Sequence, residues 1–327
     1  MNRRDTAFAL LALSAAPLAA FAQPANKLFR VGYLAAGGTP ADGALPASLR
    51  AALRDLGYIE GKTISYTGRW ADAKLERLPA LAAELIALKP DLILTLGAPA
   101  IAAVKKATTT IPVIITGSGG DAVATGMIAS LARPGGNITG MSDDAGTLSA
   151  TRMEILKEAV PKAKRIAILW NTDDHAMTLR YKAIENAARV LNVTVQALGV
   201  REPDDFATAF NAMTRERPDA LFLVADALTV LNRKRVIEFS ELHRIPAMYE
   251  FGFYVQSGGL MSYGPNVDDI NLNVARFVDR IIKGAKPADL PAEQPTRYYL
   301  TINLKTAKTL GLAIPQSLAI RADEVIQ

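Results

Sequence analysis

The chain has 327 residues, of which 50% are hydrophobic and 21% are charged, and its formal net charge is +5. This length is enough for one large or two medium α/β domains with a sizeable core. Basic residues form no run with interleaved aromatics, which argues against nucleic-acid binding, and the absence of cysteine excludes a cysteine nucleophile, cysteine-ligated zinc and a lipid-attachment cysteine.

The first 22 residues are typical of a secretory signal peptide. Arg3 and Arg4 give a basic start, residues 7–20 form an apolar stretch that is short for a membrane span, and Ala20-Phe21-Ala22 is a small-x-small cleavage site. We therefore expect a signal peptide over residues 1–22, cleavage after Ala22, and a periplasmic mature protein that is not a lipoprotein. The paired arginines leave both the Sec and the twin-arginine routes open.

The first half of the chain alternates predicted strands and helices, with Gly or Pro after nearly every strand. This alternation predicts a parallel, doubly wound sheet. The predicted strands are 28–34, 64–70, 91–96 and 111–115, and the predicted helices are 45–56, 75–88, 100–107 and a helix-like segment at 123–132.

The alternation restarts near Gly140, which predicts a second α/β half of similar size. The predicted strands are 164–170, 193–200, 219–224 and 245–249, and the predicted helices are 151–160, 178–191, 204–217 and one that ends at Arg244.

Single elements follow in the C-terminal portion and add to the two halves. They are a strand with a crossover at 258–264, an amphipathic helix at 267–283, an extended segment at 294–304 and a helix at 304–310. The chain must therefore cross between the halves more than once. We expect residues 28–140 plus 262–284 in the first lobe, and residues 141–261 plus 285–327 in the second.

Catalytic constellations are scarce. The only histidines are His175, predicted in a loop beside two aspartates where it could act as a base, and His243 at a helix end. Surface positions are the favoured interpretation for both. Residues 117–120 lack the Gly-Lys-Ser/Thr end of a phosphate-binding loop, and no Gly-x-Ser-x-Gly motif occurs. We expect no catalytic residues, no metal site and no cofactor.

Small and polar residues at the carboxyl ends of the predicted strands form a candidate ligand cleft, since ligands bind at that edge of an open α/β sheet. Backbone N–H groups around Gly97-Ala98 and Thr116-Gly117 would hold a carboxylate, and Asp226 or Glu250 an ammonium group. The alternative interpretation is that these residues have no role in ligand binding, because the turns of any α/β sheet carry small residues. The candidates are Ala36, Gly37, Gly97, Ala98, Pro99, Thr116, Gly117, Ser118, Asn171, Asp174, Asp226, Tyr249, Glu250 and Tyr263. For Trp70 and Trp170, packing is favoured over a place in the cleft.

Three blocks make the chain recognisable: LARPGGNITG at 131–140, GGLMSYG at 258–264 and RADEVI at 321–326. With them, the chain resembles the ABC-transporter substrate-binding proteins of the family that includes tryptophan/tyrosine uptake components. The resemblance implies a type I periplasmic-binding-protein fold, in which two α/β lobes joined by three crossovers close on a small ligand. It also implies a membrane permease and its ATPase as partners.

We therefore expect a monomeric, exported solute-binding receptor that closes on a small organic ligand and delivers it to a permease. The ligand would be an amino acid, aromatic or otherwise, or another small carboxylate. One alternative is a periplasmic sensor that presents the ligand to a membrane receptor, and the other is a periplasmic enzyme on the same fold. Residues 120–123, GDAV, differ from the Gly-Asp-Pro-Val usual in the family at the ligand loop, so the identity of the ligand stays open.

Overall fold

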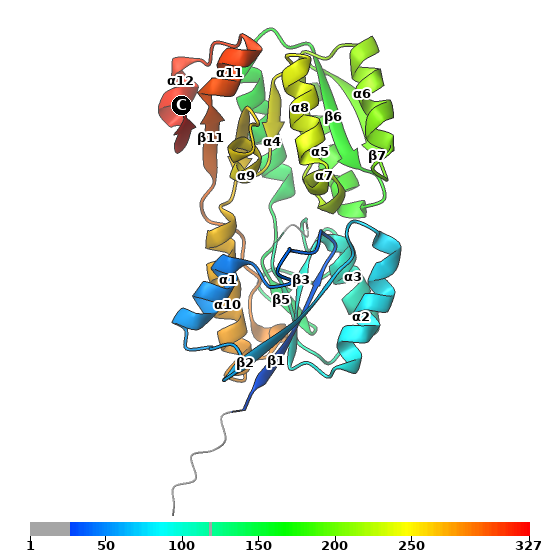
Figure 1. Cartoon of the computed structure of the whole chain (residues 1–327), viewed down its shortest axis with the longest axis vertical. Coiled ribbons are helices and arrows are strands. Elements are labelled where there is room, and N and C mark those ends of the chain that lie inside the picture. The colour runs from blue at the N-terminus through cyan, green and yellow to red at the C-terminus, as the bar shows by residue number, and fades with distance from the viewer. Residues whose placement is uncertain (1–26, 118–119) are drawn as a thin grey trace, which may run out of the picture.

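The structure, a computed structural model, describes residues 27–117 and 120–327. The chain forms two α/β lobes, each built on its own sheet (Figure 1). The first lobe holds strands β1 to β5 and the second holds β6 to β12. Helix α10, late in the sequence, returns to the first lobe and lies beside α1 (Figure 1).

The first sheet has five strands in the order β2-β1-β3-β4-β5, and every neighbouring pair is parallel. Two helices cover each face, which buries the inner strands β3 and β4 on both sides and explains their nearly continuous apolar sequences, whereas the edge strand β2 is only partly buried. The strands are β1 (Phe29–Ala35), β2 (Ile64–Trp70), β3 (Leu92–Leu96), β4 (Val113–Ile115) and β5 (Ile138–Gly140). Helices α1 (Ala47–Asp55) and α10 (Val267–Ile282) cover one face, and α2 (Leu78–Ala87) and α3 (Ala98–Ala107) the other.

The second sheet has seven strands in the order β12-β11-β10-β9-β8-β6-β7. The β10–β11 pair is antiparallel and the other pairs are parallel. The strands are β6 (Arg165–Asn171), β7 (Thr194–Val200), β8 (Ala220–Leu223), β9 (Ala247–Tyr249), β10 (Met261–Gly264), β11 (Tyr299–Asn303) and β12 (Glu324–Ile326). One face packs on α4 (Ala145–Ala159), α5 (His175–Val190), α11 (Leu304–Leu310) and α12 (Gln316–Arg321), and the other on α6 (Asp205–Arg215), α7 (Ala227–Leu231), α8 (Arg233–Leu242) and α9 (Gly252–Gln256).

The chain passes between the lobes after β5, after β10 and after α10. The first and third of these crossovers lie side by side. Ser142 N donates to the Glu293 carbonyl at 2.8 Å, and Glu293 N donates to the Gly140 carbonyl at 2.9 Å. Paired extended segments of this kind link the lobes as a hinge.

One strand differs from the predicted division of the chain. Ser262 in β10 lies opposite Tyr249 on one side and Thr301 on the other, so β10 belongs to the second sheet. Residues 262–264 were expected in the first lobe. The other boundaries of the two lobes remain a prediction.

The helix predicted at 123–132 is wrong, because this segment forms turns. The Asp121 carboxylate accepts hydrogen bonds from Val123 N and Ala124 N, both at 2.9 Å, and Gly126 follows with φ +70°. A left-handed residue at that point ends the turn. The short strand β5 was missed, and His175 begins α5 rather than lying in a loop.

Helices of the described part of the chain are all too short or too polar to cross a membrane.

Candidate ligand-binding cleft

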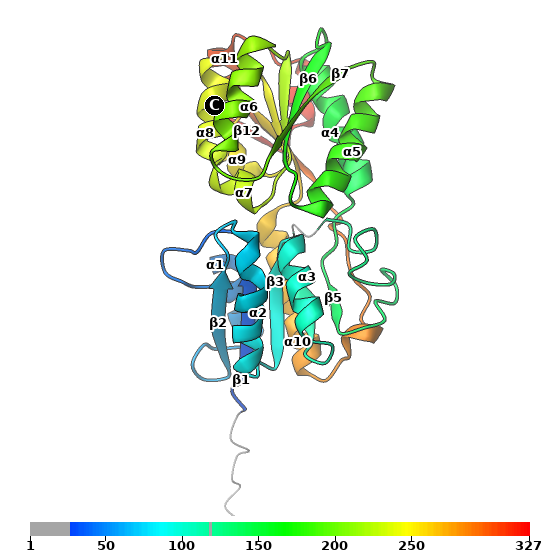
Figure 2. The ribbon, with the colours of Figure 1, turned by 90° about the vertical axis from the view of Figure 1, so that its right-hand side faces the viewer.

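A cavity of about 210 Å³ lies between the lobes, where the carboxyl ends of both sheets meet. Figure 2 shows α5 and α7 of the second lobe facing the first lobe. The wall residues are Ala36, Gly37, Leu75, Leu96, Gly97, Thr116, Gly117, Asp174, Ala225, Asp226, Ala227, Val230, Phe251, Phe253, Val267 and Ile270.

Several predicted site residues share this wall. From the first lobe these are Ala36, Gly37, Gly97, Thr116 and Gly117, and from the second lobe Asp174 and Asp226. They meet because the loops after parallel strands all leave one edge of a sheet. That they contact a ligand remains a prediction.

The polar end of the cavity belongs to the second lobe. Asp174 caps α5 by accepting a hydrogen bond from Ala176 N at 2.9 Å, and Asp226 caps α7 by accepting one from Thr229 N at 2.9 Å. Asn171 lies behind the wall and donates to Asp226. Each carboxylate is therefore fixed at the start of a helix, next to the cavity.

Burial makes both carboxyl groups hold their protons more tightly than usual. It raises the pKa of Asp174 to about 6, and the negative charge of Asp226 adds to the rise. Burial also raises the pKa of Asp226, and this effect exceeds the lowering of the pKa by the hydrogen bonds that Thr229 and Asn171 donate to its carboxylate. A cationic group placed between the two carboxylates would favour their ionised forms.

The first lobe supplies backbone rather than charge. Gly97 and Gly117 have φ +95° and +115°, values that L side chains rarely adopt, so bare backbone lines the cavity here. Thr116 Oγ1 donates to the Thr95 carbonyl at 3.0 Å. Among the described residues no side chain caps the amino end of α3, so this helix start can face an anionic group.

The remaining wall is apolar and comes from both lobes. Leu75, Leu96 and Ile270 lie on the first-lobe side and Val230 on the second-lobe side. The Phe251 and Phe253 rings stack with centroids 5.6 Å apart and an interplanar angle of 8°. The site thus combines an acidic end with room for an apolar or aromatic body. The aromatic pair was missed, although FGF at 251–253, one residue after β9, was a usable signal.

Glu250 does not have the predicted role. Its side chain is fully buried outside the cavity wall, with one oxygen 3.3 Å from Arg152 Nη1 and the other bonded to Arg180 Nη1. Arg180 also pairs with Asp143 at 2.8 Å, at the first crossover. The carboxylate is thus already neutralised by two guanidinium groups and cannot serve as the partner of a ligand ammonium.

Other predicted residues lie beside the cavity or away from it. Ala98 and Pro99 form the first turn of α3 behind Gly97, and Ala98 packs into the core cluster of the second lobe. Tyr249 is buried against Tyr254, and Tyr263 lies beside Tyr298 with ring centroids 6.0 Å apart. Ser118 lies outside the described residues.

Trp170 and the two histidines pack or face solvent. Trp170 stacks on Tyr181 with ring centroids 3.9 Å apart, and His243 packs on Phe239 at 4.3 Å. His175 is exposed at the start of α5. In the described ranges no three His, Cys, Asp or Glu side chains come together in a group that could hold a metal ion.

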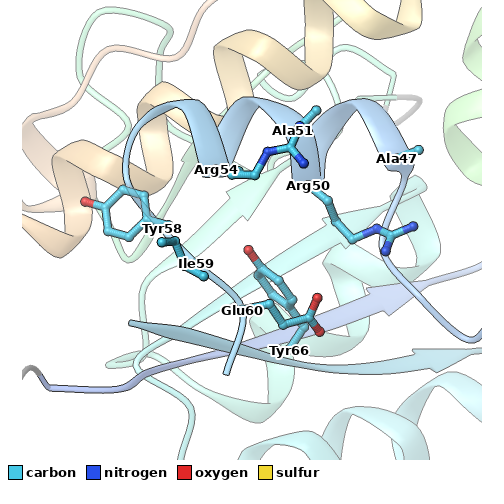
Figure 3. A pocket seen from close by; sticks show the side chains of 8 residues that line it. All are labelled: Ala47, Arg50, Ala51, Arg54, Tyr58, Ile59, Glu60 and Tyr66. Carbon is cyan, nitrogen blue, oxygen red and sulfur yellow. The ribbon is translucent and has the colours of Figure 1, made fainter. Parts of the chain in front are cut away.

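A larger pocket of about 440 Å³ lies on the first lobe alone (Figure 3). Arg50 and Arg54 come from α1, Tyr66 comes from β2, and Tyr58, Ile59 and Glu60 come from the connection between them. Burial and the charge of Glu60 raise the pKa of Tyr66 to about 12. This pocket is lined by residues 47–66 alone, whereas both lobes line the cavity between them, which is the stronger candidate.

Comparison with known proteins agrees with this geometry. The family described as "ABC transporter substrate binding protein" matches residues 40–326. The "Tyrosine-binding protein" of Clostridioides difficile (strain R20291) is 27% identical over 262 residues, which cover 80% of this chain and 74% of that protein.

Two solved structures share the fold. One is an ABC domain from Streptococcus pneumonia in complex with L-Trp, 24% identical, with a TM-score of 0.84 over 92% of this chain and 100% of that one. The other is a conserved domain protein from Vibrio cholerae, 24% identical, with a TM-score of 0.84 over 91% of this chain and 100% of that one. The predicted type I periplasmic-binding-protein fold is therefore confirmed.

Proposed function

The chain belongs to the ABC transporter substrate-binding protein family, and from this premise we propose that it is an exported receptor for a small amino acid-like ligand. The observation that carries the proposal is the cavity between the lobes. It has two buried carboxylates on one lobe, bare backbone and a helix start on the other, and apolar walls between them.

An α-amino acid fits this distribution of charge. Its ammonium group would lie against Asp226 and Asp174, and its carboxylate against the backbone at Gly97 and Thr116-Gly117. Its side chain would face Phe251 and Phe253, which favours an aromatic or large aliphatic group. A tyrosine-binding relative and a solved structure with bound L-Trp support the aromatic choice.

Lobe closure is the proposed mechanism. A ligand that contacts both lobes binds the closed arrangement more tightly than the open one and so shifts the population toward closure. In this structure the lobes already touch. Ala98 of the first lobe belongs to a core cluster of the second lobe, and a Cβ added at Gly120 would lie 2.9 Å from the Ala176 Cβ. The paired crossovers would act as the hinge.

Delivery to a membrane permease with its ATPase, in the periplasm and as a monomer, completes the proposal. It includes no catalytic step, no metal and no cofactor. The signal-peptide-like sequence of residues 1–22 and the family support it. Amino-terminal sequencing of the periplasmic protein should begin at Gln23, and deletion of the gene should abolish uptake of the ligand.

A thermal-shift screen tests the ligand class. L-Tyrosine, L-tryptophan and L-phenylalanine are compared with 3-phenylpropionate, which lacks the ammonium group, and with phenethylamine, which lacks the carboxylate. An amino acid at a concentration 100 times its Kd should stabilise the protein by about 2.7 kcal/mol, and both truncated compounds should shift the melting temperature much less. Equal shifts with 3-phenylpropionate, or no shift with any amino acid, would overturn the proposal.

A further inference from the structure

A second hollow adjoins the cleft. Its volume is about 380 Å³, and it is lined almost entirely by the first lobe. We call it the outer chamber and the cavity between the lobes the inner chamber. The two chambers share Gly37, Leu96 and Val230 in their walls, so these three residues mark the junction.

The junction is open at Gly37. A Cβ added there would meet no atom of the described residues within 4 Å, and the backbone of Gly37 is not in the positive-φ region. The next residue contrasts with it, because a Cβ at Gly38 would lie 2.7 Å from Leu231 Cδ2. Space for a side chain is therefore present at Gly37, which lines both chambers, and absent at Gly38.

The outer chamber has an aromatic and aliphatic lining. The Tyr33 and Trp70 rings lie with centroids 6.0 Å apart at an interplanar angle of 51°, and Leu45, Pro40 and Pro46 complete much of the wall. Aromatic faces and prolines of this kind suit an apolar side chain.

Positive charge lies at the same chamber. Arg50 extends from α1 away from Tyr66, toward the chain that leads into the helix (Figure 3). Its Nε donates to the Leu45 carbonyl at 3.1 Å, and its Nη2 lies 3.4 Å from Asp42 in a partly exposed ion pair. A guanidinium held in this way can also face a carboxylate that enters the chamber.

We propose that the two chambers form one site for a ligand longer than a free amino acid, namely a dipeptide with an apolar second residue. The inference rests on the proposed function, since the amino end again lies against Asp226 and Asp174. The first side chain lies against Phe251, the peptide unit crosses at Gly37, and the second side chain lies against Tyr33 and Trp70. The terminal carboxylate then lies toward Arg50.

The experiment compares L-phenylalanine with L-phenylalanyl-L-leucine by calorimetry. Burial of the leucine side chain should give the dipeptide an affinity about tenfold or more above that of the amino acid. Trp70→Ala, at a residue that lines the outer chamber only, should remove this gain while the affinity for phenylalanine changes little. Gly37→Leu, at the junction, should weaken the dipeptide more than it weakens phenylalanine. Gly136→Leu is the matched control, because a Cβ at exposed Gly136 also meets no described atom within 4 Å and Gly136 is remote from the chambers.

A second readout locates the dipeptide. The chain has only two tryptophans, so Trp170→Phe leaves Trp70 as the sole tryptophan reporter. The dipeptide should change the emission of Trp70 more strongly than phenylalanine does, because only the dipeptide places a side chain against it. If phenylalanine binds as tightly as the dipeptide, or if Trp70→Ala weakens both equally, the two-chamber site is overturned while the amino acid receptor stands. If neither compound binds the wild-type protein, both proposals fail.

Discussion

Asn171 Nδ2 donates a hydrogen bond of 2.6 Å to Asp226 Oδ2, and this bond joins the carboxyl ends of β6 and β8 at the wall of the cleft. The other oxygen of Asp226 accepts the Thr229 N–H and caps α7. The carboxylate is thus held from two sides, and Asn171, which is itself buried, positions it without lining the cavity. A carboxylate fixed in this way is prepared for a cationic partner.

Replacement of this carboxylate should weaken an amine-bearing ligand. Asp226→Asn keeps a residue that caps helices well but removes the charge, so we expect a loss of about 10- to 100-fold in affinity, since hydrogen bonds to charged groups contribute about 1.5–3 kcal/mol. Calorimetry with the best ligand of the screen measures the loss. Asp173→Asn is the control, because it removes the same charge from an exposed residue that directly precedes Asp174. Unchanged affinity in the Asp226 variant would remove the carboxylate from the site.

The raised pKa of Asp174 predicts a pH dependence of stability. Because burial raises the pKa to about 6 from 3.8, the folded protein retains a proton between pH 4 and pH 6 that the unfolded chain has released. The free energy of unfolding should therefore fall as pH rises through this window, by on the order of 2–3 kcal/mol from this group.

Asp174→Asn, which preserves the cap of α5, should not show that fall. Urea unfolding without ligand should find the variant about as stable as wild type near pH 4 and more stable near pH 7. The comparison must be differential, because carboxylates such as Asp72 and Asp219, whose pKa values are lowered, change stability in the opposite sense. A stability difference that is constant with pH would contradict the prediction.

The ion pairs of Glu250 should matter for stability rather than for binding chemistry. Removal of one partner from a buried pair leaves uncompensated charge, so Glu250→Ala should lower the free energy of unfolding by about 3–5 kcal/mol. Glu216→Ala is the matched control, because Glu216 pairs with Arg165 at 3.5 Å on the surface and should matter little. Similar losses in the two variants would argue against a structural role for the buried cluster.

Gly264 should tolerate no side chain. This residue ends β10 just before the second crossover, and a Cβ there would lie 1.8 Å from the Glu250 carbonyl oxygen, a backbone atom. Gly264→Ala must move one of two neighbouring backbones and should cost about 2 kcal/mol or more in thermal or urea unfolding. Gly136→Ala, in open space, should stay close to wild type. Equal stability of the two variants would mean that the backbone near the second crossover can shift at little cost in free energy.

Local sequence determined the elements and their order. Alternating strands and helices predicted a doubly wound sheet in each half, and the predicted segments 64–70 and 304–310 coincide with β2 and α11. Hydrophobic periodicity and Gly or Pro at element ends carry this information within a few residues. The same rule brought Gly37, Thr116, Asp174 and Asp226 to one wall, because the loops after parallel strands share a sheet edge.

Tertiary structure alone decided which of those residues are free to meet a ligand. Glu250 looked available in the sequence, but Arg152 and Arg180, 98 and 70 residues away, neutralise it in the fold. The segment 123–132 looked helix-like in the sequence, yet the Asp121 carboxylate and the positive φ of Gly126 hold it in turns. Val230 and Ile270 enter the cleft because the lobes meet there. Desolvation and charge pairing depend on which groups surround a residue in space, and the spacing of residues along the chain does not specify those groups.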